Sequence, residues 1–256
     1  MSIETTQPLP VSDLTTMLCD AHDRTRALVQ GLDADQLMGP RLAIVNPLLW
    51  EIGHVGWFHE HFVLAGLDRQ GSYIDGSDML YDSMKVAHDS RWDLELPDLA
   101  TTLSYMERVR DALCDRLSRK GKTAGVCDTY HTLLTLFHED MHDEAFTWSR
   151  QTLSYPTPDF GAPATRDDAG PLPGDVEIPG GSHVMGAVGD EPFIFDNEKW
   201  GHRVDVAAFS MARAPVTNAE YADFVADGGY GERCDHRHDQ YGLTDDDRFS
   251  GVEQVQ

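Results

Sequence analysis

The sequence has few cysteines, and their spacing excludes two common uses of this residue. Only four cysteines occur among 256 residues, and no two of them form a C-x-x-C pair. Small disulfide-stabilised domains need a denser framework, and clustered zinc ligands need closer spacing. We therefore expect reduced thiols and a cytoplasmic protein.

Basic residues and long apolar runs are also scarce. Lysine and arginine together number 20 against 44 acidic residues, which gives a formal net charge of −24. Nucleic acids and anionic membranes repel such a surface, so we expect neither as a partner. No stretch is long and apolar enough to span a bilayer, and the N-terminus lacks a signal-peptide pattern. A hydrophobic content of 41% nevertheless supports a real core.

Helical patterns dominate the first 155 residues. Apolar side chains recur at helical spacing in four segments, at about 11–37, 47–64, 99–119 and around 130–146, with Gly66 expected to close the second and the fourth ending before Pro156. Between the second and third segments, residues 72–97 read as a long loop of the kind that often lines a site. Four such helices with inward-facing histidines predict a bundle with a metal in its core.

Two histidines of the last helical segment are candidate metal ligands. His138 and His142 are four residues apart, which places both imidazoles on one face of a helix, one turn from each other. His131 falls on that face too. Two imidazoles in this arrangement can each offer a nitrogen to one metal ion. A single histidine would more simply be a surface residue, but the pair favours a metal site.

The second helical segment offers the third ligand. It carries His54 between two glycines, Gly53 and Gly56, which would let a neighbouring helix or a ligand approach closely. His61 lies two turns further on and is an alternative ligand. His59 points elsewhere on the helix and is expected to be solvated.

Another interpretation rests on the H-E-x-x-H pattern formed by His138, Glu139 and His142. Zinc proteases use this pattern with the glutamate as general base, but they take their third ligand from further along the chain. Here the next histidine is His183, beyond a Pro- and Gly-rich stretch. A zinc-dependent hydrolase or thiol transferase with Glu139 as base therefore stays an alternative, as does a non-catalytic metal-binding remnant.

The pattern changes after the helical region. Residues 156–175 are rich in Pro and Gly, as a linker between domains is. Short strands and turns are then predicted from 176 to 209, followed by a short helix at 218–225 with Thr217 or Asn218 as its cap. From 231 onward the chain is polar without periodicity. The predicted organisation is a bundle at 1–155, a linker at 156–175, a second domain at 176–230 and a polar tail at 231–256.

Several motifs together resemble one family. They are N-P-L-L-W-E-I-G-H-x-x-W-F at 46–58, Y-D-S-x-x-V-A-H-D-x-R-W at 81–92, F-H-E-D-M-H-D-E-A-F at 137–146 and I-P-G-G-S-H-V-M-G at 178–186. In this order they resemble the non-haem iron sulfoxide synthases of ergothioneine biosynthesis, and most of all the branch that includes selenoneine synthase. The resemblance covers roughly residues 10–230.

The resemblance implies a fold and a metal site. The fold is α plus α+β: a DinB-like four-helix bundle, then an incomplete formylglycine-generating-enzyme-like (sulfatase-modifying factor) domain of C-type-lectin-like type. One Fe(2+) ion would be held by His54, His138 and His142. Arg91 would clamp a substrate carboxylate, and Glu144 would orient a ligand or pack just behind the ligands. No catalytic residue is assigned.

The resemblance also implies an activity. Members of this family are oxidoreductases that form a C–S or C–Se bond on the imidazole ring of hercynine, using O2 and a thiol or selenosugar donor. In this family the second domain closes over the iron. Here its resemblance stops near residue 230, so we expect a truncated chain with an incomplete cover over the metal.

Overall fold

The computed structural model describes residues 7–160, 172–189, 191 and 193–230. The chain divides into two compact units, Met1–Pro163 with Val184–Val204, and Ala164–His183 with Asp205–Gln256. The first unit contains the long helices, and the second contains short strands and one helix. This agrees with the predicted fold class, a helical region followed by a region with short strands.

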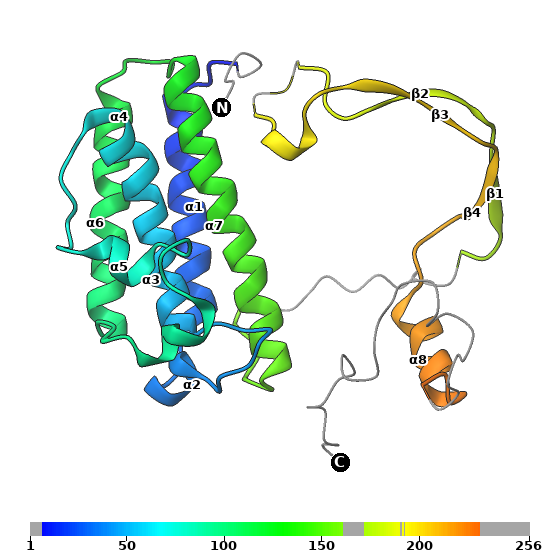
Figure 1. Ribbon diagram of the computed structural model, residues 1–256, viewed down its shortest axis with the longest axis horizontal. Helices are drawn as coiled ribbons and strands as arrows, with labels where there is room; N and C mark the ends of the chain where they lie inside the picture. The colour runs from blue at the N-terminus through cyan, green and yellow to red at the C-terminus, as the bar shows by residue number, and fades with distance from the viewer. Residues whose placement is uncertain (1–6, 161–171, 190, 192, 231–256) are drawn as a thin grey trace. The chain divides into compact units, whose positions relative to one another are not determined.

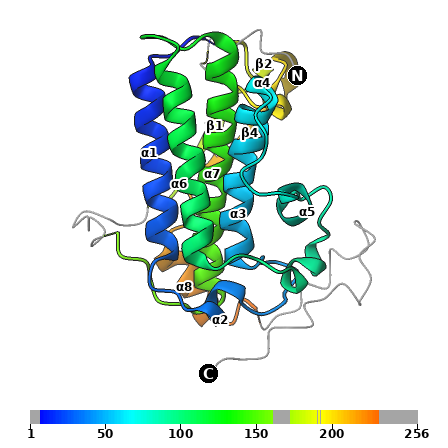
Figure 2. The ribbon, with the colours of Figure 1, turned by 90° about the vertical axis from the view of Figure 1, so that its left-hand side faces the viewer.

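Four long helices form the bundle, and they lie side by side in both ribbon views (Figures 1 and 2). Helix α1 packs against α6 and α7, and α3 packs against the same two helices from the other side. Their bounds are Val11–Val29 for α1, Leu48–His59 for α3, Leu99–Ser118 for α6 and Val126–Thr152 for α7. The expected helices at 99–119 and around 130–146 are therefore confirmed.

Buried leucines and valines from all four long helices fill the bundle, together with a few aromatic rings. One cluster of this core includes Leu14, Val109, Leu113 and Leu133, and a second cluster includes Phe146. Burial of such side chains stabilises each by about 1.5–3 kcal/mol relative to exposure, which makes this packing the main force that holds the helices together.

The first predicted helix, at 11–37, is wrong in its extent. Helix α1 ends at Val29, and Gly31 then takes a positive φ of 79° that other residues rarely adopt. A separate short helix, α2 (Ala34–Met38), begins at Asp33, whose carboxylate accepts a hydrogen bond from the Gln36 backbone N–H. The Asp33 backbone N–H donates in turn to Gln36 Oε1, so a capping box starts the new helix.

The second predicted helix runs past its expected end. Helix α3 continues into a π-helical stretch, η1 (Glu60–Ala65), and then a short turn, α4 (Gly66–Asp68). Gly66 keeps helical dihedrals, and the chain leaves the helix at Arg69, where φ is 54°. The buried Glu60 carboxylate accepts hydrogen bonds from the Tyr105 hydroxyl and the Tyr73 backbone N–H, which satisfies its charge inside the bundle.

The predicted loop at 72–97 contains two short helical turns, α5 (Ser77–Tyr81) and the 3-10 turn η2 (His88–Asp93). Two indole N–H groups of α3 fasten α5 to the bundle. Trp50 Nε1 donates to the Leu80 carbonyl at 2.7 Å, and Trp57 Nε1 donates to Asp78 Oδ1 at 2.8 Å. The loop is thus held against the helix that carries His54.

Short strands follow the bundle, as predicted. Strand β1 (Asp175–Ile178) pairs antiparallel with β4 (Phe209–Ala212), and β2 (Gly181–Met185) pairs with β3 (His202–Val206). A 3-10 turn, η3 (Asp196–Glu198), precedes β3, and α8 (Asn218–Ala226) is capped by Thr217. Residues 161–171 of the predicted linker and the predicted tail lie outside the described residues. Among the helices that the structure describes, none has the length and apolar character to cross a membrane.

A short segment after the linker packs on the bundle within the first unit. Ile194 is buried. The centroid of the Phe193 ring lies 5.1 Å from that of Tyr130 and 5.4 Å from that of Phe137, both on α7. The domain boundaries predicted at 155 and 175 stay a prediction.

Close packing at a glycine joins α3 to the loop. A Cβ atom placed on Gly53 would lie 2.2 Å from the Tyr81 ring, so only glycine lets this buried ring reach the helix. The expectation that Gly53 permits a close approach is confirmed, and the approaching group is the aromatic ring at the end of α5.

Replacing Gly53 by alanine tests this contact. Alanine favours a helix by about 1 kcal/mol over glycine, yet we expect Gly53→Ala to lower the free energy of unfolding by about 1–3 kcal/mol, because the Tyr81 ring must move. The matched control is Gly71→Ala, at an exposed position where a Cβ meets nothing within 4 Å. Urea unfolding of both variants measures the difference, and equal stability would contradict the packing argument.

Candidate metal centre

Three histidines meet where α3 faces α7. His54 projects from α3 and His138 and His142 from α7, and one ring nitrogen from each lies within 4.8 Å of the other two. The Nε2 atoms of His54 and His138 are 3.3 Å apart. His54 is buried, while His138 and His142 are half-buried, so the cluster lies at the edge of the core.

The backbone of the loop fixes which nitrogen of His54 is free. Its Nδ1 lies 2.7 Å from the Tyr81 carbonyl oxygen, which can only accept a hydrogen bond. The proton of the neutral ring therefore sits on Nδ1, and Nε2 presents its lone pair toward His138. Metal-binding histidines in proteins are commonly oriented in this way by an acceptor behind the ring.

The surroundings favour the neutral form of His54 and His138. Burial, together with the nearby His142, lowers the pKa of His54 to about 4. Burial lowers the pKa of His138 as well, again with contributions from His142 and His54. Neutral imidazoles are the form that binds a metal, so protons compete weakly with a cation at these two rings near neutral pH.

The spacing suits a single metal ion. Two nitrogen ligands of one ion lie about 3 Å apart when each bond is about 2.1 Å long and the bonds meet near a right angle. The 3.3 Å between the Nε2 atoms of His54 and His138 is close to that value. Imidazole suits iron as well as zinc, so the ligands alone do not select the metal.

Aromatic rings hold two of the histidines in place. The Trp50 ring stacks on His54 with centroids 4.8 Å apart, and the Phe58 ring stacks on His138 at 3.6 Å. Both aromatic residues come from α3, one turn on either side of His54. They leave little room for rotation of the two imidazoles and present an apolar wall to the site.

The other residues singled out in the sequence lie elsewhere. His61 is half-exposed beside Asp78, and His131 bonds to the Cys127 carbonyl, so neither belongs to the cluster. Glu144 is exposed and borders a groove with Arg24 and neighbouring residues of α1 and α7. The structure does not bring Glu144 to the three histidines.

Arg91 contacts Trp50, the aromatic residue that stacks on His54. Its guanidinium lies over the Trp50 ring, 3.8 Å from the centroid, and its Nη1 donates to Asn46 Oδ1 at 2.6 Å. Trp50 in turn stacks on His54, so the arginine lies behind the ring that supports a histidine. Arg91 is buried, and the predicted contact with a substrate carboxylate stays a prediction.

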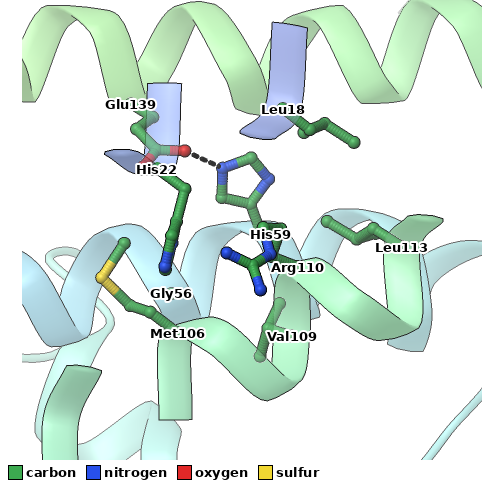
Figure 3. A pocket seen from close by; sticks show the side chains of 9 residues that line it. All are labelled: Leu18, His22, Gly56, His59, Met106, Val109, Arg110, Leu113 and Glu139. Carbon is green, nitrogen blue, oxygen red and sulfur yellow. Dashed lines mark hydrogen bonds and ion pairs between the residues drawn. The ribbon is translucent and has the colours of Figure 1, made fainter. Parts of the chain in front are cut away.

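Glu139 points away from the histidine cluster, into the bundle. Its Oε2 accepts a hydrogen bond from His59 Nε2 at 2.9 Å and its Oε1 accepts one from the Thr25 hydroxyl at 2.8 Å; Figure 3 shows the first of these. Burial raises the pKa of Glu139, but the hydrogen bond and charge of His59 outweigh it and leave the pKa lowered. The expectation that His59 is solvated is wrong, because a carboxylate from another helix supplies a buried partner.

Comparison with known proteins defines the family. The sequence pattern described as DinB superfamily matches residues 17–146, half of the 256 residues. This chain belongs to the DinB superfamily. The pattern described as sulfatase-modifying factor enzyme 1-like domain matches residues 160–254 of the same DinB-superfamily chain. The resemblance found in the sequence is confirmed for both domain types.

Several relatives of this DinB-superfamily chain are curated. It is 35% identical to the hercynine oxygenase of Mycolicibacterium thermoresistibile over 87% of this chain and 50% of the relative. It is 33% identical to that of Mycolicibacterium smegmatis over 85% and 51%, and 26% identical to the ergothioneine biosynthesis protein 1 of Neurospora crassa over 77% and 25%. The chain spans about half the length of the hercynine oxygenases it matches.

The pair of His59 and Glu139 generates a test of stability. Removal of His59 takes a hydrogen-bond donor from the buried Glu139 carboxylate, so we expect His59→Ala to lower the free energy of unfolding by about 3–5 kcal/mol. His131→Ala, a half-buried histidine on α7, should change it by less than about 0.5 kcal/mol. Chemical unfolding measures both.

The double variant His59→Leu/Glu139→Leu separates the pair from its packing. Since apolar side chains of similar size can replace a buried pair, it should be more stable than His59→Ala. A single variant as stable as the unaltered protein would mean that His59 does not support Glu139.

Proposed function

We propose that this chain holds one Fe(2+) ion through His54, His138 and His142, as part of an oxidoreductase of ergothioneine or selenoneine biosynthesis. The proposed reaction joins a sulfur or selenium donor to the imidazole ring of hercynine, with O2 as oxidant. The observation that carries the proposal is the convergence of three imidazoles from two helices.

Two further observations support it. Relatives that are identical to this chain at about a third of the aligned positions are named hercynine oxygenases, and the match to them runs through both the bundle and the strand region. Three histidine ligands would also leave coordination positions for a substrate and O2, as an oxygenase requires. Because the chain spans about half of these relatives, the activity of a whole enzyme is carried to it only as a proposal.

The chain's own residues would prepare the site. Iron(II), when bound, supplies the electron transfer with O2 that bond formation of this kind needs. The Tyr81 carbonyl keeps the proton of His54 on Nδ1, so Nε2 stays available as a ligand. The rings of Trp50 and Phe58 hold His54 and His138 in orientation and exclude water from one side of the cluster.

The zinc-hydrolase alternative has less support. In that reading Glu139 would act as general base on a metal-bound water, and its carboxylate would have to face the metal. Both oxygens of Glu139 are instead engaged by His59 and Thr25 inside the bundle. No observation favours a second function.

An anaerobic Fe(2+) titration tests the ligand set. The unaltered chain should bind one equivalent, and His138→Ala should weaken binding by at least about 100-fold, because changes merely behind a metal ligand already cost 10–100-fold. His61→Ala is the control, since His61 lies on the continuation of the same helix as His54 but outside the cluster. Its affinity for iron should not change.

Oxygen uptake then tests the reaction. With iron bound, O2 should be consumed only when hercynine and a thiol or selenosugar donor are both present. Iron binding without uptake would contradict the oxidoreductase activity of this chain, and tight zinc binding without iron binding would contradict the metal assignment.

A further inference from the structure

A buried carboxylate lies beside the third histidine of the cluster. Glu51, on α3, is 2% exposed, and its Oε1 is 3.7 Å from Nδ1 of His142. His142 Nδ1 and Glu51 Oε2 are both buried atoms without a hydrogen-bond partner in the described part of the structure. The carboxylate therefore lies just beyond hydrogen-bond distance of a buried ring nitrogen that lacks a partner, and its other oxygen, Oε2, lacks a partner too.

Glu51 is held in this position by a second contact. The Asn46 side chain donates from Nδ2 to Glu51 Oε1 at 2.7 Å, and Asn46 Oδ1 accepts from Arg91 Nη1 at 2.6 Å. The guanidinium is also close enough for the charge of Glu51 to raise the pKa of Arg91 against the effect of burial, which lowers it. Asn46 and Arg91 thus hold the carboxylate, and the single bond from Asn46 leaves a second acceptor site on Oε1 and all of Oε2 open.

The geometry points to Glu51 as a positioning residue for the metal site: it accepts a hydrogen bond from Nδ1–H of His142 and so directs the other nitrogen of that ring to the metal. This inference rests on the proposed function, because it assigns a role toward the same ion. A carboxylate behind a histidine fixes the tautomer of the ring and strengthens it as a ligand.

Glu51 does not fit the other available role, that of a fourth ligand. The cluster of ligand atoms within 4.8 Å of one another contains the three histidines and does not include the carboxylate. Glu51 approaches Nδ1 of His142, behind the ring, and its bond from Asn46 already uses the nearer oxygen. A rotation that shortens 3.7 Å to a hydrogen bond is enough for the positioning role.

The three histidines would then have different supports. His54 donates to a neutral backbone carbonyl, that of Tyr81, whereas His142 would donate to an ionised carboxylate. Hydrogen bonds to a charged acceptor are roughly twice as strong as neutral ones. His142 would therefore be the stronger donor toward the metal, and the site would be electronically asymmetric.

The test uses Co(II), which binds histidine sites and reports on them spectroscopically, under anaerobic conditions. Glu51→Gln keeps the shape of the side chain and removes its charge. We expect it to weaken Co(II) and Fe(II) binding by 10–100-fold. The metal-free variant should unfold at the same urea concentration as the unaltered protein, because the amide oxygen of Gln can still accept the hydrogen bond from Asn46. A merely structural role would lower stability and affinity together.

A second readout follows the imidazole proton itself. In the Co(II) form, the ring N–H protons of bound histidines give strongly shifted, exchangeable proton resonances. One of them, from His142, should exchange with solvent faster in Glu51→Gln than in the unaltered protein. Glu107→Gln, an exposed glutamate on α6, is the control and should change neither the affinity nor the exchange.

Asn46→Ala is the second variant, because it releases Glu51 without altering either member of the pair, and it should weaken metal binding several-fold. Equal affinity and equal exchange in Glu51→Gln and the unaltered protein would overturn the inference alone. Failure of the unaltered protein to bind either metal would overturn the proposed function, and this inference with it.

Discussion

The hydrogen bond from His54 Nδ1 to the Tyr81 carbonyl is the interaction on which the site depends. It exists because Gly53 has no side chain, so the Tyr81 ring can lie directly against α3 and bring its backbone within 2.7 Å of the neighbouring histidine. The packing of Tyr81 against Gly53 and the orientation of His54 therefore depend on the same contact. A larger residue at Gly53 would act on the metal site without touching a ligand.

Helix α7 has polar residues on two adjacent faces, about 100° apart, and each face is used differently. His138 and His142 meet α3, while Glu139 and Asp143 face α1 and share the hydroxyl of Thr25. Burial raises the pKa of Asp143 to about 7, even though Thr25 and Arg24 both donate to it. One face therefore carries imidazole nitrogen atoms, and the other carries carboxylates that need hydrogen-bond partners.

Spacing along the sequence predicts much of the site, whereas the rest depends on contacts between helices. The relation of His138 to His142 follows from one helical turn, so the sequence predicts it directly. The choice of His54 over His61 needed the family resemblance, since both fall near one face of the same helix.

The role of Glu51 and the burial of His59 could not be read from the sequence. Each depends on how α3 is turned toward a partner residue more than 75 positions away, His142 or Glu139. The bundle was predictable from periodicity alone, whereas the breaks at Gly31 and Arg69 depend on single positive φ angles. Asp33 is a recognisable cap, and with Gln36 three residues later it could have placed the start of α2.

The seating of Phe193 on α7 has a mechanical consequence. Phe137 precedes His138 by one position, and the two side chains leave the helix about 100° apart. The Phe137 ring packs against Phe193 and Phe195 at 5.4 and 6.0 Å. Because a helix turns as a rigid body, any twist of α7 that adjusts the His138 ring also presses Phe137 into that aromatic contact or withdraws it. The contact of Phe193 and Phe195 with Phe137 therefore constrains the orientation of His138 indirectly.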